Sequence, residues 1–152
     1  MIKSRKSNID DNKNKKIMSN LDHYSQFVEK LTSNTSNDTT IMIDHIYQLQ
    51  KENPSINISL LMTSAFGLSS ESGEFTEIVK KILYQSKPLN EDNIFHMKRE
   101  LGDIFFYLMN ACRSIGIQPD EVIAENVRKL KNRYPSEKFE GSFSENRQPG
   151  DL

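Results

Sequence analysis

Four carboxylates are the residues of this chain whose types and spacing could do chemistry. Glu71 and Glu74 lie three positions apart, and Glu100 and Asp103 repeat that spacing. Residues three or four apart share one face of an α-helix, so each pair could present two ligands side by side. Carboxylate oxygens suit hard divalent cations such as Mg²⁺ or Mn²⁺ better than zinc or copper. We therefore take these four acids as candidate metal ligands and catalytic residues.

The positions of these acids in their helices favour a functional role over a solvated face. Apolar residues at Leu68, Phe75 and Ile78 follow helical spacing that predicts an apolar residue at position 71, where the chain has Glu71. The second pair opens the segment 101–112, which is apolar almost all round, so we expect that helix to be central and buried. A buried carboxylate must be protonated, paired or bound to metal. Pairing with lysine or arginine remains the alternative.

Each acidic pair encloses a glycine, Gly73 in ESGE and Gly102 in ELGD. A glycine inside a helix costs about 1 kcal/mol relative to alanine. We expect these glycines to allow close approach of the two helices, which would bring the four carboxylates together.

The elements that must position these residues are helices. All five prolines fall between segments of helical periodicity, and no stretch alternates convincingly with period two. The pattern predicts helices at about 20–31, 41–53, 58–85, 91–116 and 119–134, with a polar linker at 32–40. Because the connections between the long helices are short, we expect an all-α fold, an antiparallel helical bundle.

Composition divides the 152 residues into three parts. Residues 1–17 hold six basic and two acidic residues with little apolar content, which predicts a disordered basic leader. Residues 18–135 form the helical domain, and residues 136–152 form a C-terminal tail.

The same composition excludes several classes of protein. No apolar run approaches the ~18 residues of a membrane helix, and the N-terminus lacks the apolar core of a signal peptide. A net charge of −1 argues against broad binding to nucleic acid, and a single cysteine, Cys112, cannot form an internal disulfide. We expect a cytoplasmic protein that binds neither membrane nor nucleic acid.

The motifs ESGE, ELGD and NVRKLKNRYP, in this order, resemble those of the MazG-like all-α nucleotide pyrophosphohydrolases, in particular the small single-domain forms encoded by phages. The resemblance covers roughly residues 58–135. It implies Mg²⁺-dependent hydrolysis of a nucleoside triphosphate to a monophosphate and pyrophosphate, with a preference for deoxynucleotides. It also implies that the four carboxylates hold the magnesium and that the chain forms a homodimer or homotetramer.

One position departs from the family pattern. Family members often begin the first motif with two adjacent glutamates, whereas this chain has Ser70 before Glu71. Glu77, one turn beyond Glu74, could compensate, and the number of metal ions stays open.

Binding of a triphosphate also requires basic or polar side chains that contact its phosphates. Asn126, Lys129 and Arg133 repeat at steps of three and four on one helix face, and the resemblance matches them to phosphate-contacting residues. A solvated basic face is the alternative reading. Lys81 lies two turns beyond Glu74, and Tyr107 lies one turn past Asp103, where it could equally belong to the core. The candidate substrate-binding residues are therefore Asn126, Lys129, Arg133, Tyr134, Lys81 and Tyr107.

Two other functions remain compatible with this pattern. Related all-α enzymes hydrolyse dUTP or phosphoribosyl-ATP with similar acidic clusters. A non-catalytic module could instead hold a metal–nucleotide complex without turning it over.

Overall fold

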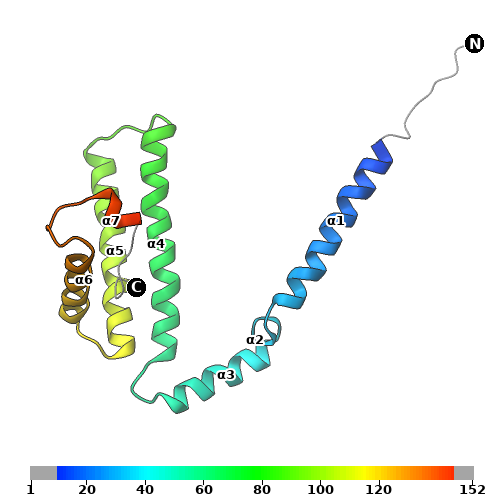
Figure 1. Ribbon diagram of the computed structural model, residues 1–152, viewed down its shortest axis with the longest axis horizontal. Coiled ribbons are helices and arrows are strands. Elements are labelled where there is room, and N and C mark those ends of the chain that lie inside the picture. Colours follow the sequence, from blue (N-terminus) through cyan, green and yellow to red (C-terminus); the bar gives the residue numbers. More distant parts are fainter. Residues whose placement is uncertain (1–9, 146–152) are drawn as a thin grey trace, which may run out of the picture. The chain divides into compact units, whose positions relative to one another are not determined.

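The computed structural model describes residues 10–145, and this part of the chain is built from helices with no strand. The all-α expectation is confirmed. The chain divides into two compact units, residues 1–48 and 49–152, which we describe separately (Figure 1).

The first unit contains α1 (Asp10–Leu31), α2 (Asn34–Asn37) and most of α3 (Thr39–Glu52). The helix α1 begins within the segment 1–17 that is expected to be a disordered leader, and residues 1–9 of that segment lie outside the described part. The expected linker contains the single turn α2, which the side chain of Ser33 caps.

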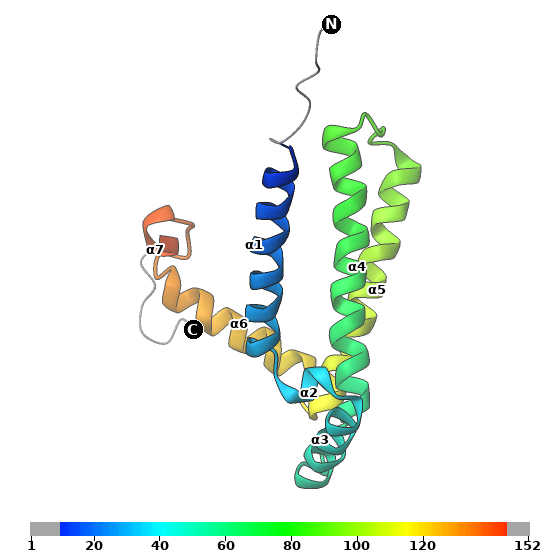
Figure 2. The same ribbon diagram turned by 90° about the vertical axis from the view of Figure 1, so that its right-hand side faces the viewer.

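The second unit is built on two long helices, α4 (Ile58–Tyr84) and α5 (Glu91–Ile115). They lie side by side and antiparallel in both views (Figures 1 and 2). Asn90 caps α5 by accepting a hydrogen bond from the Asn93 amide at 3.1 Å. Gly116, at φ 73°, ends the helix in the left-handed conformation that favours glycine. Both signals were read from the sequence, and both are confirmed.

The contact between α4 and α5 is narrow. Of the side chains that the structure describes, the buried apolar ones are Ile78 and Cys112. The hydroxyl side chains of Ser64 and Ser114 are buried as well. At one end of the pair, the Asn57 amide donates a hydrogen bond of 2.7 Å to the Ser114 carbonyl. This bond ties the start of α4 to the end of α5.

The close approach of the helices occurs at a different glycine from those expected. A Cβ added at Gly67 would lie 2.2 Å from Cε1 of Tyr107, so the tyrosine ring packs directly on the α4 backbone. A Cβ added at Gly73 or Gly102 would meet no atom within 4 Å. The expectation that Gly73 and Gly102 serve close approach is therefore wrong within this chain, because they lie beside rather than in the contact.

The helix α6 (Pro119–Arg133) does not join the pair. It leaves the lower end of α5 and points away from both long helices, and the short helix α7 (Gly141–Glu145) follows it (Figure 2). Within the described residues of this unit, α4 is the helix that packs along α5, and Phe105 and Phe106 of α5 are 64% and 60% exposed. The expectation that the segment 101–112 is buried on all sides is not met within one chain.

The helices of the described residues include none that is both long and apolar enough to cross a membrane.

Candidate metal centre

Three of the candidate carboxylates converge across the pair of long helices. One carboxylate oxygen each from Glu71 and Glu74 of α4 and from Glu100 of α5 lie within 4.8 Å of one another. The two helices run antiparallel, and the spacing of three positions places Glu71 and Glu74 on adjacent turns of the face next to Glu100. The fourth acid, Asp103, lies one turn further along α5 and is exposed.

The negative charges of the cluster act on one another. Partial burial, together with the charges of Glu74, Asp103 and Glu100, raises the pKa of Glu71 above its usual value of 4.5. All four acids thus act on one site, although Asp103 lies outside the tight group of three. A bound cation would remove the repulsion that raises this pKa.

Glu100 is the most buried of the four acids, with 6% of its surface exposed. His96 lies one turn before it, with Nε2 3.1 Å from Oε1 of Glu100. The donor atoms of the group are carboxylate oxygens alone, which is the chemistry that Mg²⁺ and Mn²⁺ prefer. The residues present therefore fit a hard divalent cation, and Glu71, Glu74 and Glu100 would hold it.

Glu77 does not take part in the group of three. Lys80 forms an ion pair with it, and Lys81 lies 3.3 Å from its other oxygen. Hydrogen bonds from these two lysines lower the pKa of Glu77. The idea that Glu77 compensates for Ser70 finds no support in this geometry, because its carboxylate is already engaged.

A cavity of about 340 Å³ opens beside the acidic group. Glu74 forms part of its wall, and the other lining residues are Ser70, Gly73, Glu77, Ile78, Lys81, Lys87 and His96. The structure thus places the candidate Lys81 close to the carboxylates. The sequence reasoning missed Lys87, which lies in the connection between the two helices. It also missed His96, although the spacing of four residues between His96 and Glu100 is a signal that could have found it.

The candidate residues of α6 lie apart from the acids within one chain. Asn126 and Lys129 border a shallow cavity of about 380 Å³ on their own helix, which confirms that they share a face. Arg128 is engaged by Glu125 through two hydrogen bonds from its guanidinium group. Because α6 points away from the long helices (Figure 2), the structure does not bring Asn126, Lys129 or Arg133 to the acidic cluster.

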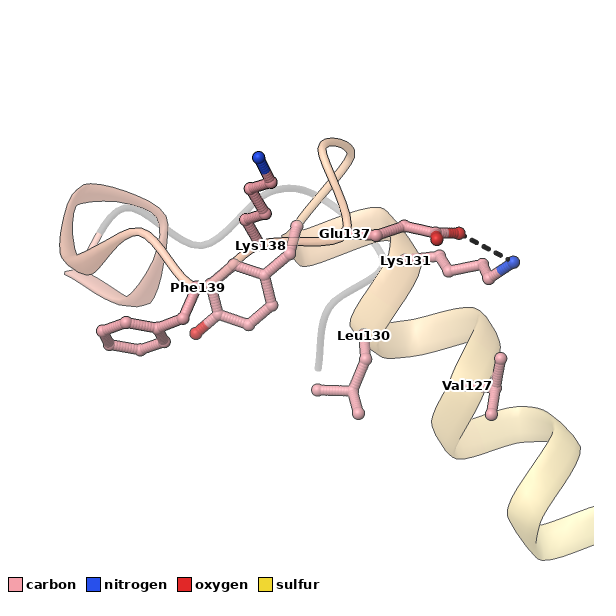
Figure 3. Close-up of a pocket in the computed structure, with 7 residues that line it drawn as sticks. Val127, Leu130, Lys131, Glu137, Lys138 and Phe139 are labelled. Carbon is pink, nitrogen blue, oxygen red and sulfur yellow. Dashed lines mark ion pairs between the residues drawn. The ribbon is translucent and has the colours of Figure 1, made fainter.

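Tyr134 lies in another place again. It caps the end of α6 and lines an apolar cavity of about 450 Å³ with the chain that follows. Its ring centroid is 5.7 Å from that of Phe139, and Lys131 and Glu137, which also line the cavity, form an ion pair at 3.1 Å (Figure 3). The cavity is lined mainly by apolar side chains and lacks an acidic cluster.

Tyr107 is a packing residue in this structure. Its half-buried ring lies against Gly67 and makes an edge-to-face contact with Phe106, with centroids 5.2 Å apart. These contacts account for its position without a ligand.

Comparison with known proteins gives two findings. Residues 62–137, half of the chain, match the family described as the MazG nucleotide pyrophosphohydrolase domain. The Gene 37 protein of Mycobacterium phage L5 is 30% identical over 77 residues, which cover 50% of this chain and 68% of that protein. No solved structure matches the chain. The matched region contains all four candidate acids and the α6 motif.

Proposed function

The chain belongs to the MazG nucleotide pyrophosphohydrolase family, which makes it a hydrolase, and from that premise we propose that it is a Mg²⁺-dependent enzyme. We propose that it converts nucleoside triphosphates, preferentially deoxynucleotides, into monophosphates and pyrophosphate. The observation that carries this proposal is the convergence of Glu71, Glu74 and Glu100 from two helices on one point. The deoxynucleotide preference is what the resemblance to the small phage-encoded forms implies, and the likeness to a phage protein agrees with that type.

The reaction adds water across the anhydride between the α- and β-phosphates. The oxygen of water forms a bond to the α-phosphorus, the bond from that phosphorus to the bridging oxygen breaks, and the bridging oxygen leaves with the pyrophosphate. A proton is lost from the attacking water, and Glu71 or Glu74 is placed to accept it.

The carboxylates alone would repel a triphosphate. Mg²⁺, or Mn²⁺ in its place, would supply the positive charge that offsets this repulsion and would acidify a bound water. Glu71, Glu74 and Glu100 would hold the ion, and Asp103, one turn away, would be a further ligand. The acids would thus bind the metal directly, and they would hold the substrate only through the positive charge of that metal.

We further propose that the enzyme is a homodimer or homotetramer. Apolar side chains stand exposed on the outer face of α5, such as Phe105 and Phe106, and on α6, where Ile123 is 61% exposed. Burial of such side chains contributes about 1.5–3 kcal/mol each. A neighbouring subunit's α6 packed over α5 would bring Lys129 and Arg133 toward the acids, which one chain does not do by itself.

A nucleotide panel tests the function. The purified chain is incubated with each nucleoside triphosphate, each deoxynucleoside triphosphate, dUTP and phosphoribosyl-ATP in the presence of Mg²⁺, and products are resolved by chromatography. We expect monophosphate and pyrophosphate in equal amounts from deoxynucleotides. Glu71→Gln and Asp103→Asn should each lower turnover by at least about 100-fold, because even outer-shell changes at metal sites cost 10–100-fold. Glu91→Gln, an exposed acid in the first turn of α5, is the matched control.

The other outcomes identify the rival functions. Turnover confined to dUTP or phosphoribosyl-ATP would assign the chain to one of the related enzyme activities. Tight nucleotide binding without pyrophosphate release, with either Mg²⁺ or Mn²⁺, would make it a binding module and would contradict the proposal.

A further inference from the structure

We propose that the cavity beside Glu74 binds the two terminal phosphates of the substrate, and that Lys81 and Lys87 are the residues that hold them. The inference rests on the proposed function, because it identifies where the leaving pyrophosphate lies in the same site. One of the two lysines, Lys87, lies in the connection between α4 and α5, outside the helical motifs of the sequence.

The cavity and the acidic group share a wall. Glu74 belongs to the group of three carboxylates and also lines the cavity, so the cavity adjoins the place where a cation would be held. Lys81 and Lys87 line the same cavity, as does Glu77, whose carboxylate pairs with Lys81. The cavity therefore adds two ammonium groups beside the acidic group, and a metal-bound polyphosphate needs positive charge of this kind.

The backbone fixes Lys87 beside Lys81. The amides of Gln85 and Lys87 both donate hydrogen bonds to the carbonyl of Lys81, at 3.0 and 3.1 Å. Ser86 between them adopts φ 56°, the left-handed conformation, and so turns the chain back over the end of α4. The backbone of Lys87 is consequently fixed at the C-terminal end of α4, beside Lys81.

The two lysines differ in their partners. Lys81 shares the carboxylate of Glu77 with Lys80, and its side chain is 45% exposed. Lys87 is half-buried, and the structure gives it no carboxylate partner within the described residues. A half-buried ammonium group without a counterion gains more from an anionic ligand than an exposed, paired one does.

The lining of the cavity favours phosphate over a nucleobase. Bases are bound by stacking on aromatic side chains, and among the described residues that line this cavity there is no phenylalanine, tyrosine or tryptophan. The apolar part of the wall is Ile78 with Gly73, while the remaining groups are charged or polar. The terminal phosphates therefore match this wall better than the base does.

Binding of inorganic pyrophosphate tests the inference without turnover. Isothermal titration calorimetry with Mg²⁺ present measures its affinity for the full chain and for the variants Lys87→Gln, Lys81→Gln and Lys80→Gln. Lys80 is the matched control, because it pairs with Glu77 as Lys81 does but does not line the cavity. We expect Lys87→Gln and Lys81→Gln each to weaken binding about tenfold, the loss of one hydrogen bond to a charged group. Lys80→Gln should bind like the wild type, and circular dichroism checks that each variant is folded.

Two results would overturn the inference. One is pyrophosphate binding to the wild type that both cavity variants leave unchanged, which places the phosphates elsewhere. The other is a wild type that binds no pyrophosphate with Mg²⁺ present. Failure of the proposed function looks different: Lys87-dependent pyrophosphate binding would persist while no triphosphate is hydrolysed.

Discussion

The contact between Gly67 and Tyr107 predicts that Gly67→Ala in α4 destabilises the fold, whereas Gly102→Ala in α5 stabilises it. A methyl group at position 67 would lie 2.2 to 2.4 Å from three atoms of the tyrosine ring. Carbon atoms in good contact are about 3.5–4.0 Å apart, so the ring would have to move by more than about 1 Å. Overpacking of this kind costs about 1–3 kcal/mol.

Alanine also favours the helix by about 1 kcal/mol over glycine, and this gain must be separated from the clash. Gly102→Ala provides the separation, because a Cβ there meets no atom within 4 Å and only the helix propensity changes. We expect Gly102→Ala to raise the free energy of unfolding by up to about 1 kcal/mol. Gly67→Ala should unfold about 1–3 kcal/mol more easily than Gly102→Ala.

Urea denaturation at one fixed chain concentration measures these differences, since the stability of an oligomer depends on concentration. Repeating Gly67→Ala in a Tyr107→Ala background completes a double-mutant cycle. Without the ring, the methyl group should stabilise the fold as it does at position 102. The reasoning is refuted if Gly67→Ala stabilises the wild type as much as Gly102→Ala, or if its effect is the same in both backgrounds.

Three further predictions follow from the acidic group and the end of α4. The raised pKa of Glu71 means that its protonated form is favoured by folding, so the metal-free chain loses stability as pH rises from 4.5 through that pKa; Glu71→Gln should abolish this part of the slope in denaturation series at several pH values. Mg²⁺ at about 100 times its dissociation constant should stabilise the wild type by about 2.7 kcal/mol, and thermal melts with and without chelator should show no such gain for Glu100→Gln. Ser86→Gly should stabilise the chain by about 1 kcal/mol, because φ 56° strains any residue with a Cβ; an unchanged urea midpoint would contradict it.

Local signals made most of the helix boundaries predictable. Asn90 before two acidic residues, Gly116 in the left-handed conformation and Pro119 at the start of α6 act through their own backbone or side chain, so the sequence alone contains the information. The same holds for Glu71 and Glu74, whose spacing is enough to place them on one face. Their meeting with Glu100 depends on the two helices being adjacent, and the short connection between these helices predicts that they are.

Features that depend on contacts between segments were missed or misplaced. Gly67 and Gly73 are both glycines inside α4, and only the position of the Tyr107 ring distinguishes the one that needs to be small. Lys87 reaches the cavity because Ser86 reverses the chain, a turn that no glycine or asparagine signals. The direction of α6 and the exposure of Phe105 depend on contacts with other segments. Helical periodicity does not show which segments make these contacts.

The hydrogen bond between the Asn57 amide and the Ser114 carbonyl has a consequence at the distant acids. One turn of helix advances about 5.4 Å, whereas the oxygens of Glu71, Glu74 and Glu100 lie within 4.8 Å of one another. Sliding α4 along α5 by a single turn would therefore pull the ligands out of reach of a common ion. The 2.7 Å hydrogen bond opposes such a shift. The register of α4 along α5, on which the meeting of the ligands depends, is therefore fixed in part at the end of the pair where α4 begins and α5 ends.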